Sequence, residues 1–475
     1  MTEAERFDFV IVGSGPAGHA AAIIAARAGH SVAVIERDRG VGGACVQRGT
    51  IPSKTLRETA AYFAGLKARS CGALTAHIPP EVQLTTLMAR MERVVEQHSA
   101  LNANQFEQHG VVQIHGRASF TGPREVEVVG VRGGTRRLVG GTILVAVGSR
   151  PRTPPNVPVD HEHVLDSDSV LSAMYLPRSL AILGGGVIAA EYASIFAALG
   201  VEVAMIDRFP RPVGFLDQEL TDRFVAHFEA HEGCRFLGDR KVAHVQWDGA
   251  AYVVTQLDNG EIIRADKMLC AQGRVGNIES LQVERAGLQA NDRGLLDVDE
   301  HGRTAVPHIY ACGDVIGAPA LASSSREQGR RAVYHALGQA CPNPPETTPI
   351  GIYTIPEMAA VGMTEEQARA AHGDVRVGRA KFSEIARGLI SANTSGILKL
   401  VTKTDGTLLG AHVLGEGATE IIHLAQLALQ AGLGVRAFAD SVFNFPTLAE
   451  AYSVAADEIV REMAEPQLAA PATVG

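Results

Sequence analysis

Two short glycine-rich segments are each followed by an acidic residue at the same distance. Gly13-Ser14-Gly15-Pro16-Ala17-Gly18 precedes Glu36, and Gly184-Gly185-Gly186-Val187-Ile188-Ala189 precedes Asp207; both acids lie 23 residues after the first glycine (36 − 13 and 207 − 184). Glycines let the backbone turn tightly and approach a pyrophosphate, and an acid at this distance accepts hydrogen bonds from ribose hydroxyls. We therefore expect two dinucleotide sites, contacted by Gly13, Gly15, Gly18 and Glu36 in the first and by Gly184, Gly186 and Asp207 in the second.

The residues around each segment predict the elements that such a site needs. Each segment lies between an apolar run, typical of a buried parallel strand, and an Ala-rich stretch, typical of a helix. A second apolar run ends just before each acid. The strands are expected at residues 7–12, 31–35, 179–183 and 201–206, and the helices at 16–28 and 187–199. A helix that begins at the turn directs free N–H groups and positive potential at a phosphate, so the flanks support both sites.

The rest of the chain contains further helices, two meanders and a third region. Helices are predicted near Pro52 and over 84–108, and residues 111–141 alternate as in a small antiparallel meander. A second meander is expected after Asp207. Apolar runs at 143–147 and 267–271 then stop at Gly148 and Gly273, which we include among the cofactor-contacting positions. From about Pro349 the pattern changes to strands and amphipathic helices without a glycine-rich turn.

This organisation predicts an α/β protein with two Rossmann-like dinucleotide-binding domains and an α+β C-terminal domain. A chain of 475 residues is too long for one hydrophobic core. We place the first domain at residues 1–155 and 280–345, the second at 156–279, the third at 346–465, and a disordered Ala/Pro-rich tail at 466–475.

Composition excludes several classes of function. A net charge of −9 argues against a nucleic-acid surface, which needs a basic patch. No apolar run reaches the roughly 20 residues that span a bilayer. The six cysteines are scattered, with neither a disulfide framework nor a zinc spacing, so we expect no metal site. The N-terminus is not typical of a signal peptide, and a reducing, cytoplasmic setting is expected.

The segment from Gly42 to Lys54, Gly-Gly-Ala-Cys-Val-Gln-Arg-Gly-Thr-Ile-Pro-Ser-Lys, resembles the active-site segment of the FAD-dependent pyridine nucleotide-disulfide oxidoreductases. The resemblance extends from Gly13 to Tyr452. It implies that the first fold binds FAD, that the second binds a nicotinamide nucleotide, and that the C-terminal domain forms a homodimer or a larger homo-oligomer.

The same resemblance implies roles for three more residues. Asp314, which ends the run from Ile309, would contact the ribityl chain of FAD, although by position alone it could equally be a turn residue. Lys54 would lie beside the flavin and pair with Glu191 on the second nucleotide helix; the alternative for Lys54 is a solvated surface lysine.

The departures from this family concern its dithiol chemistry. Disulfide reductases carry two cysteines separated by four residues, whereas here Cys45 is followed by Thr50. A histidine precedes Pro-Thr near the C-terminus of these enzymes, and here Phe445 takes its place. A threonine cannot form a disulfide and a phenylalanine carries no proton, so no dithiol relay is expected. We favour Cys45 as a small packed side chain over a reactive thiol. Glu450, which would orient that histidine, receives no catalytic role.

Three segments are similar to the soluble transhydrogenase branch of the family: Gly49–Lys54, Gly351–Glu357 and Phe443–Thr447. The reaction implied is NADPH + NAD⁺ ⇌ NADP⁺ + NADH, by a ping-pong path through reduced FAD, with Thr50 hydrogen-bonding near the reactive edge of the flavin. Three alternatives stay open: an NAD(P)H:quinone reductase, a disulfide or metal-ion reductase with an altered active site, and a non-catalytic FAD-binding redox sensor.

The second site also bears on which nucleotide enters. Asp207 favours NAD(H), because a carboxylate repels a 2′-phosphate. Arg208 and Arg211 follow closely and could clamp that phosphate, which would admit NADP(H) as well. Solvated loop arginines are the alternative. The expected cofactors are thus FAD, NAD(H) and NADP(H).

Overall fold

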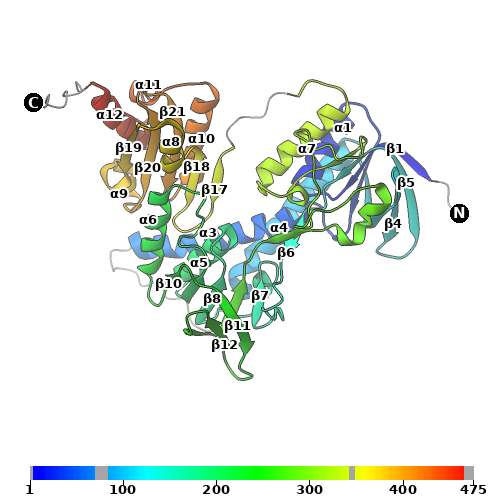
Figure 1. The fold of residues 1–475 in the computed structure, drawn as a ribbon, viewed down its shortest axis with the longest axis horizontal. Coiled ribbons are helices and arrows are strands. Elements are labelled where there is room, and N and C mark those ends of the chain that lie inside the picture. Colours follow the sequence, from blue (N-terminus) through cyan, green and yellow to red (C-terminus); the bar gives the residue numbers. More distant parts are fainter. Residues whose placement is uncertain (1–3, 70–83, 342–347, 465–475) are drawn as a thin grey trace, which may run out of the picture. The chain divides into compact units, whose positions relative to one another are not determined.

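The computed structural model describes residues 4–69, 84–341 and 348–464 (Figure 1). The chain divides into two compact units. The first unit contains Met1–Leu56, Glu81–Leu176 and Cys270–Pro344, and the second contains Arg57–Pro80, Pro177–Leu269 and Pro345–Gly475. The tail at 466–475, which the sequence predicts to be disordered, lies outside the described residues.

A parallel sheet forms the centre of the first unit. Its strand β1 (Glu5–Val12) pairs with β2 (Val32–Glu36) on one side and with β5 (Thr135–Val145) on the other. β3 (Val112–Gly122) extends the sheet beyond β2, and β16 (Ile309–Ala311) extends it beyond β5. The central strands are runs of Val, Ile and Ala buried on both faces, as expected for a parallel sheet with covered faces.

The meander of this unit grows out of the parallel sheet. β4 (Glu125–Gly130) pairs antiparallel with β3 and with the first half of β5. The sequence separates the apolar run at 143–147 from the meander at 111–141, whereas in the structure the last strand of the meander continues into this run. β5 is one strand: its first part pairs with β4 and its apolar end pairs with β16, while β1 pairs with it from Leu138 onward. The change of pattern marks a change of partner, which local periodicity cannot distinguish from a chain break.

Helices α1 (Pro16–Arg27) and α7 (Ala322–Ala336) lie side by side in the first unit (Figure 1). They approach closely at Gly329, where an added Cβ atom would come within 3.0 Å of the Ala17 carbonyl oxygen. The remaining elements of this unit are α2 (Gly43–Gln47), α4 (Leu84–Gln108), β6 (Ser149–Pro151), β7 (Val164–Asp166), β15 (Arg274–Gly276), and the 3₁₀ helices Val170–Ser172, Glu279–Leu281, Val283–Ala286 and Asp314–Ile316. Helix α3 (Thr50–Arg69) contains residues of both units.

The second unit begins with another nucleotide-type sheet. Its strands follow the order β10-β9-β8-β14, and helix α5 connects β8 to β9. These elements confirm the duplicated strand–turn–helix pattern. Their bounds are β8 (Ser179–Leu183), α5 (Val187–Ala198), β9 (Glu202–Ile206), α6 (Gln218–Glu229), β10 (Arg235–Leu237) and β14 (Lys267–Cys270), with a meander of β11 (Val242–Trp247), β12 (Val253–Leu257) and β13 (Ile262–Ala265).

The C-terminal part of this unit is an antiparallel sheet with the order β17-β18-β21-β20-β19, and helices α10 and α12 pack on it (Figure 1). Its elements are β17 (Ile350–Ile352), β18 (Met358–Gly362), α8 (Glu365–His372), β19 (Val375–Lys381), the 3₁₀ helix Phe382–Glu384, α9 (Ala386–Ile390), β20 (Ile397–Lys403), β21 (Leu408–Leu414), α10 (Ala418–Gln430), α11 (Arg436–Ala439) and α12 (Glu450–Ala464). No helix within the described ranges is long and apolar enough to cross a membrane.

A buried ion pair joins the start of α6 to the C-terminal sheet of the second unit. The Nζ atom of Lys399, on β20, lies 2.8 and 2.9 Å from the carboxylate oxygens of Asp217 and 2.8 Å from Glu365. Asp217 also caps α6, since its side chain accepts from the backbone N–H of Glu219 at 3.1 Å. Burial alone would lower the pKa of Lys399, but the hydrogen bonds to Asp217 and Glu365 outweigh it and hold that pKa raised.

Candidate cofactor and active sites

In the first glycine-rich turn, two glycines are tightly packed against backbone and the third is not. Gly13 has a φ of 103° and Gly18 packs on it, so that a Cβ atom at either position would come within 3.0 Å of a backbone carbonyl oxygen. A Cβ atom at Gly15 would meet nothing closer than the Gly43 Cα atom at 4.0 Å. Packing thus explains two glycines, while the third leaves open backbone at the first turn of α1, which no side chain caps. This cradle fits a pyrophosphate.

The acid at the end of β2 is held rigidly beside this turn. Oε2 of the buried Glu36 accepts from the Ser14 hydroxyl at 2.6 Å and from the Ser14 N–H at 3.0 Å, and Oε1 accepts from the Asp38 N–H at 2.9 Å. The Ser14 hydroxyl also accepts from the Gly42 N–H at 2.9 Å. A carboxylate offers about four acceptor positions, so Glu36 retains capacity for a ribose hydroxyl.

Asp314 lies next to the other predicted loop positions of this unit. Its Oδ2 accepts from the Ser149 hydroxyl at 2.6 Å and lies 3.9 Å from Nε of Arg274. Gly148 and Gly273 directly precede these two partners, and both have positive φ, 64° and 95°. No protein atom lies within 4 Å of a Cβ built on either glycine, which leaves room at both positions. The structure therefore brings Gly148, Gly273 and Asp314 together at one end of the first unit.

Cys45, Thr50 and Lys54 form a second group in the first unit. Cys45 lies in the single turn of α2, and Thr50 begins α3. Burial raises the pKa of the Cys45 thiol, and this effect outweighs a hydrogen bond with the Thr50 side chain and the positive charge of Lys54, both of which lower it. The thiol is therefore protonated at neutral pH and a poor nucleophile. The Nζ atom of Lys54 lies 3.4 Å from the Ser53 hydroxyl.

The second glycine-rich turn contacts its acidic residue, Asp207, through glycine backbone and not through a serine. Gly184 has a φ of 123°, and no protein atom lies within 4 Å of a Cβ built on Gly186, at the start of α5. A Cβ atom at Gly185 would come within 3.0 Å of the Asp207 carboxylate. The acid thus lies against bare backbone, where the first turn has Ser14. The Gly185 carbonyl accepts from the Val213 N–H at 2.6 Å.

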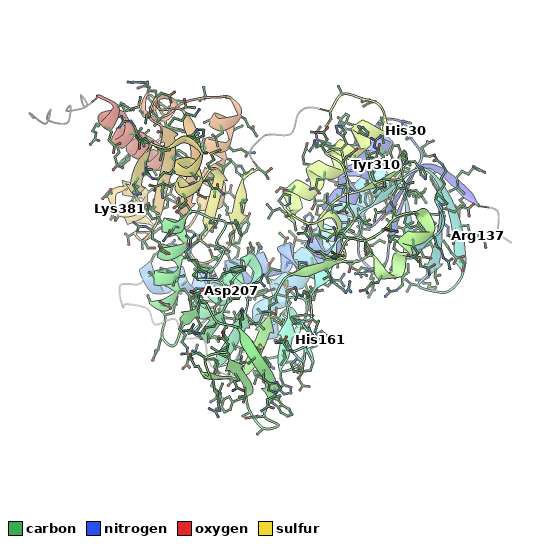
Figure 2. The ribbon with its side chains drawn as sticks, viewed as in Figure 1. His30, Arg137, His161, Asp207, Tyr310 and Lys381 are labelled. Atoms are coloured by element: carbon green, nitrogen blue, oxygen red, sulfur yellow. The ribbon has the colours of Figure 1, made fainter. Side chains whose placement is uncertain are left out.

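Asp207 directly follows β9 in the second unit (Figure 2). Its Oδ1 accepts from the Arg208 N–H at 2.9 Å, and burial raises its pKa more than this bond and the Arg208 charge lower it. Glu191 on α5 is 4% exposed, and its Oε1 accepts from the Tyr353 N–H at 3.0 Å. Lys54 and Glu191 belong to different units, so their pairing stays a prediction.

The sequence interpretation missed one residue at these sites, Ser14, and one buried cation elsewhere in the fold, Arg57. Ser14 fixes Glu36, and its hydroxyl at a variable position of the glycine motif was the available signal. Arg57, 1% exposed, carries ion pairs to Glu416 at 2.7 Å and Glu357 at 3.3 Å. No local signal marks Arg57 as buried, because these partners lie about 300 or more positions away in the chain.

Comparison with protein families gives two matches. Residues 7–329 match the model of the pyridine nucleotide-disulphide oxidoreductases, and residues 348–456 match the dimerisation domain of the same family. Together the two matches contain both glycine-rich turns, the segment with Cys45 and Thr50, and the C-terminal sheet.

Individual proteins agree with these matches. The chain is 40% identical to the soluble pyridine nucleotide transhydrogenase of Mycobacterium tuberculosis, over 96% of this chain and 98% of the relative. It is 39% identical to the soluble pyridine nucleotide transhydrogenase of Hahella chejuensis, over 95% and 97%. Among solved structures, LpdA of M. tuberculosis superposes with a TM-score of 0.87 at 29% identity, over 96% of this chain and 99% of LpdA.

A flavoprotein is also among the similar structures. The HOCl-induced flavoprotein disulfide reductase RclA of Escherichia coli has a TM-score of 0.85 at 27% identity, over 95% of this chain and 99% of RclA. The duplicated turns, the near-complete coverage and the two family matches have one explanation. The chain belongs to the pyridine nucleotide-disulphide oxidoreductase family.

Proposed function

We propose that the chain uses FAD to transfer hydride between nicotinamide nucleotides, in the reaction NADPH + NAD⁺ ⇌ NADP⁺ + NADH. The observation that carries this proposal is the pair formed by Cys45 and Thr50, in which a hydroxyl contacts a protonated thiol. One thiol cannot store an electron pair as a disulfide, and Phe445 cannot exchange a proton. A second nucleotide is then the natural acceptor, as the name soluble pyridine nucleotide transhydrogenase says of the relatives.

The first glycine-rich turn fits FAD. When bound, FAD accepts hydride from one nicotinamide ring and delivers it to another. The open backbone at Gly15, between the tightly packed Gly13 and Gly18, would face the pyrophosphate at the start of α1. Glu36 would accept from the adenosine ribose, and Asp314, with Gly148 beside its partner Ser149, would contact the ribityl side. In this proposal residues 1–155 and 280–345 form the FAD-binding domain.

Lys54, Thr50 and Cys45 would lie at the reactive end of the flavin. The Lys54 ammonium would stabilise negative charge there and would pair with Glu191. The Thr50 hydroxyl, which hydrogen-bonds with Cys45, would offer a second bond near the reactive edge. Cys45 itself would stay a packed, protonated thiol. These residues position and polarise; none of them carries electrons.

The second turn would bind the nicotinamide nucleotide, within residues 156–279. Gly184 and Gly186 would let the pyrophosphate reach the start of α5. Asp207 would accept from the adenosine ribose, and Arg208 would assist NADP(H). The remaining positions, which we assign to the nicotinamide end, are Glu191 and Gly273.

The test combines turnover with electron counting. Enzyme, NADPH and thio-NAD⁺ are mixed, and reduction of the analogue is followed by absorbance. Reductive titration should consume two electrons per FAD in the native protein. Thr50→Cys, which would place a second thiol beside Cys45, should raise this uptake to four, while the matched Thr50→Ser should leave it at two. A native uptake of four electrons, or quinone reduction without thio-NAD⁺ reduction, would contradict the proposal.

We also propose that the C-terminal domain, residues 346–465, forms a homodimer. Large apolar side chains are exposed along and after α10, at Leu424, Leu427, Leu433, Val442 and Phe445. A surface of this kind favours a protein partner. Light scattering should give twice the chain mass, and Leu427→Asp should lower it to the monomer value. A native protein that scatters as a monomer at micromolar concentration would overturn this assignment.

We further propose a cytoplasmic location. All five cysteines in the described part of the chain are free thiols, as expected in a reducing compartment. Cell fractionation with antibody detection tests this, and recovery of the protein outside the cytoplasmic fraction would contradict it.

A further inference from the structure

Each of the two acids is followed by an arginine, but the residue after that arginine differs. The first sequence is Glu36-Arg37-Asp38, and the second is Asp207-Arg208-Phe209. In the first unit, Nε of Arg37 lies 3.8 Å from a carboxylate oxygen of Asp38. The arginine beside the first acid therefore has a carboxylate within ion-pair distance, which it shares with Arg48.

The matching arginine of the second unit is placed differently. The guanidinium carbon of Arg208 lies 4.7 Å from the centre of the Phe209 ring, a cation–π distance. Within the residues that the structure describes, no carboxylate forms an ion pair with Arg208. Asp207 instead uses Oδ1 to accept from the Arg208 backbone N–H. The Arg208 charge still lowers the pKa of Asp207, but the guanidinium forms no close ion pair with that carboxylate and stays available to an incoming anion.

Such a cation suits a phosphate. A guanidinium matches the geometry of phosphate oxygens, and NADP(H) differs from NAD(H) by one phosphate on the ribose that Asp207 would bind. The other nearby arginines have partners of their own: Nη1 of Arg211 donates to the Thr221 hydroxyl at 3.4 Å, and Nη1 of Arg240 donates to the Asp239 carbonyl at 2.9 Å.

We propose that Phe209 determines whether the second site accepts the 2′-phosphorylated nucleotide. Its ring, which is 54% exposed, supports the Arg208 guanidinium and occupies the position where the first unit has a neutralising carboxylate. Phe209 is thus a positioning residue that acts through Arg208. The inference rests on the proposed function, in which one site binds both nucleotides in turn.

The test introduces a carboxylate at position 209, which corresponds to Asp38 of the first unit. Phe209→Asp and native holoenzyme are titrated by calorimetry with adenosine 2′,5′-bisphosphate and with 5′-AMP. Since a charge-assisted hydrogen bond is involved, the bisphosphate should bind about tenfold more weakly to Phe209→Asp, with 5′-AMP within about twofold of native. Phe209→Leu, which removes only the ring, should weaken the bisphosphate about two- to fivefold. The KM for NADPH should rise correspondingly, and the KM for NADH should not.

Phe215→Asp is the matched control. Phe215 lies in the same loop, is 50% exposed, and would gain the same charge, whereas the ring on which the Arg208 guanidinium lies is that of Phe209. It should bind both probes as the native protein does. Equal weakening of both probes in Phe209→Asp, or no weakening of either, would overturn the inference. These results are separable from failure of the proposed function, which shows instead as absence of thio-NAD⁺ reduction by the native protein.

Discussion

The two glycine-rich turns share one spacing but hold their acids in different ways. In the first, Ser14 supplies both its hydroxyl and its N–H to Glu36, which fixes the carboxylate from two sides. In the second turn, Gly185 has no side chain that could hydrogen-bond to the acid, and the Asp207 carboxylate lies directly against its backbone. Asp207 instead accepts from the backbone N–H groups of Arg208 and Phe209, which follow it in the chain. An acid tied to its own turn suits a nucleotide that stays bound through many turnovers, and an acid independent of the turn suits one that enters and leaves in two forms. The same motif can therefore serve opposite requirements for exchange.

The largest expected effect concerns the last position of each motif, which is Gly18 in the first turn and Ala189 in the second. A Cβ atom at Gly18 would come within 3.0 Å of the Gly13 carbonyl oxygen, which is backbone and cannot move aside easily. Gly18→Ala should therefore lower the free energy of unfolding by at least about 3 kcal/mol and reduce the FAD content. Ala189→Gly should cost only about 1 kcal/mol. Chemical denaturation and flavin absorbance measure both; similar losses in the two variants would break the comparison.

The next effect concerns acid sensitivity, because α1 carries His19 where α5 carries Ala190. Burial lowers the pKa of His19 to about 4, and its Nε2 has no hydrogen-bond partner in the structure. The unfolded chain binds this proton near pH 6.5 and the folded protein does not, so protonation favours unfolding as the pH falls from 6.5 toward 4. The free energy of unfolding should therefore be about 1–3 kcal/mol lower at pH 4 than at neutral pH.

His19→Gln should remove that part of the pH dependence. Denaturation midpoints of the native protein and the variant, compared at pH 7, 5.5 and 4, test this. Parallel curves over the whole range would show that His19 does not titrate as a buried neutral group.

A moderate effect is expected when the first turn's serine is placed in the second. Gly185→Ser introduces a Cβ atom within 3.0 Å of Asp207, whose side chain can swing away. The loss of the ribose hydrogen bond should weaken NADH binding about tenfold and leave the FAD content unchanged. Ser14→Ala is the reciprocal variant, and it should weaken FAD retention and not NADH binding. Fluorescence titration of NADH and flavin release by dilution separate the two.

The smallest effect is expected at Arg37, the counterpart of Arg208. Its contact with Asp38 is a surface ion pair, worth about 0–1 kcal/mol. Arg37→Leu should therefore change neither FAD content nor the binding of adenosine 2′,5′-bisphosphate by more than about twofold. Arg208→Leu, in contrast, should weaken the bisphosphate about tenfold. A large effect of Arg37→Leu would mean that the two arginines are not as different as their neighbours suggest.

Local patterns in the sequence predicted the architecture well, for a physical reason. A strand, a tight turn and a helix N-terminus are encoded within about 30 neighbouring residues, and the acid ends the next strand. The α/β fold with two Rossmann-like sheets and an α+β C-terminal region was predictable in this way. The single strand β5 was not, because along one edge its partner changes from β4 to β16, while β1 pairs with the opposite edge.

Features built from distant residues could not be predicted. Arg57 is buried because Glu416, 359 positions away in the chain, neutralises it. The burial of Cys45, which raises the pKa of its thiol against the opposing effect of the Thr50 hydrogen bond, depends on how the α2 turn packs against the start of α3. Charged and polar residues in a helical pattern predict an exposed face by default, and only a partner from elsewhere in the fold reverses that expectation.

The ion pair between Asp217 and Lys399 limits how modular the second half of this chain is. The duplicated turn suggests a cassette that could be moved between proteins, yet the cap of its second helix is neutralised by a lysine 182 residues away, on another sheet. A fragment that ends before that sheet would keep the Asp217 carboxylate but would lack the Lys399 ammonium that neutralises it. We therefore expect the nucleotide-binding sheet and the C-terminal sheet to melt as a single cooperative block, and a transplanted cassette to fail without its distant lysine.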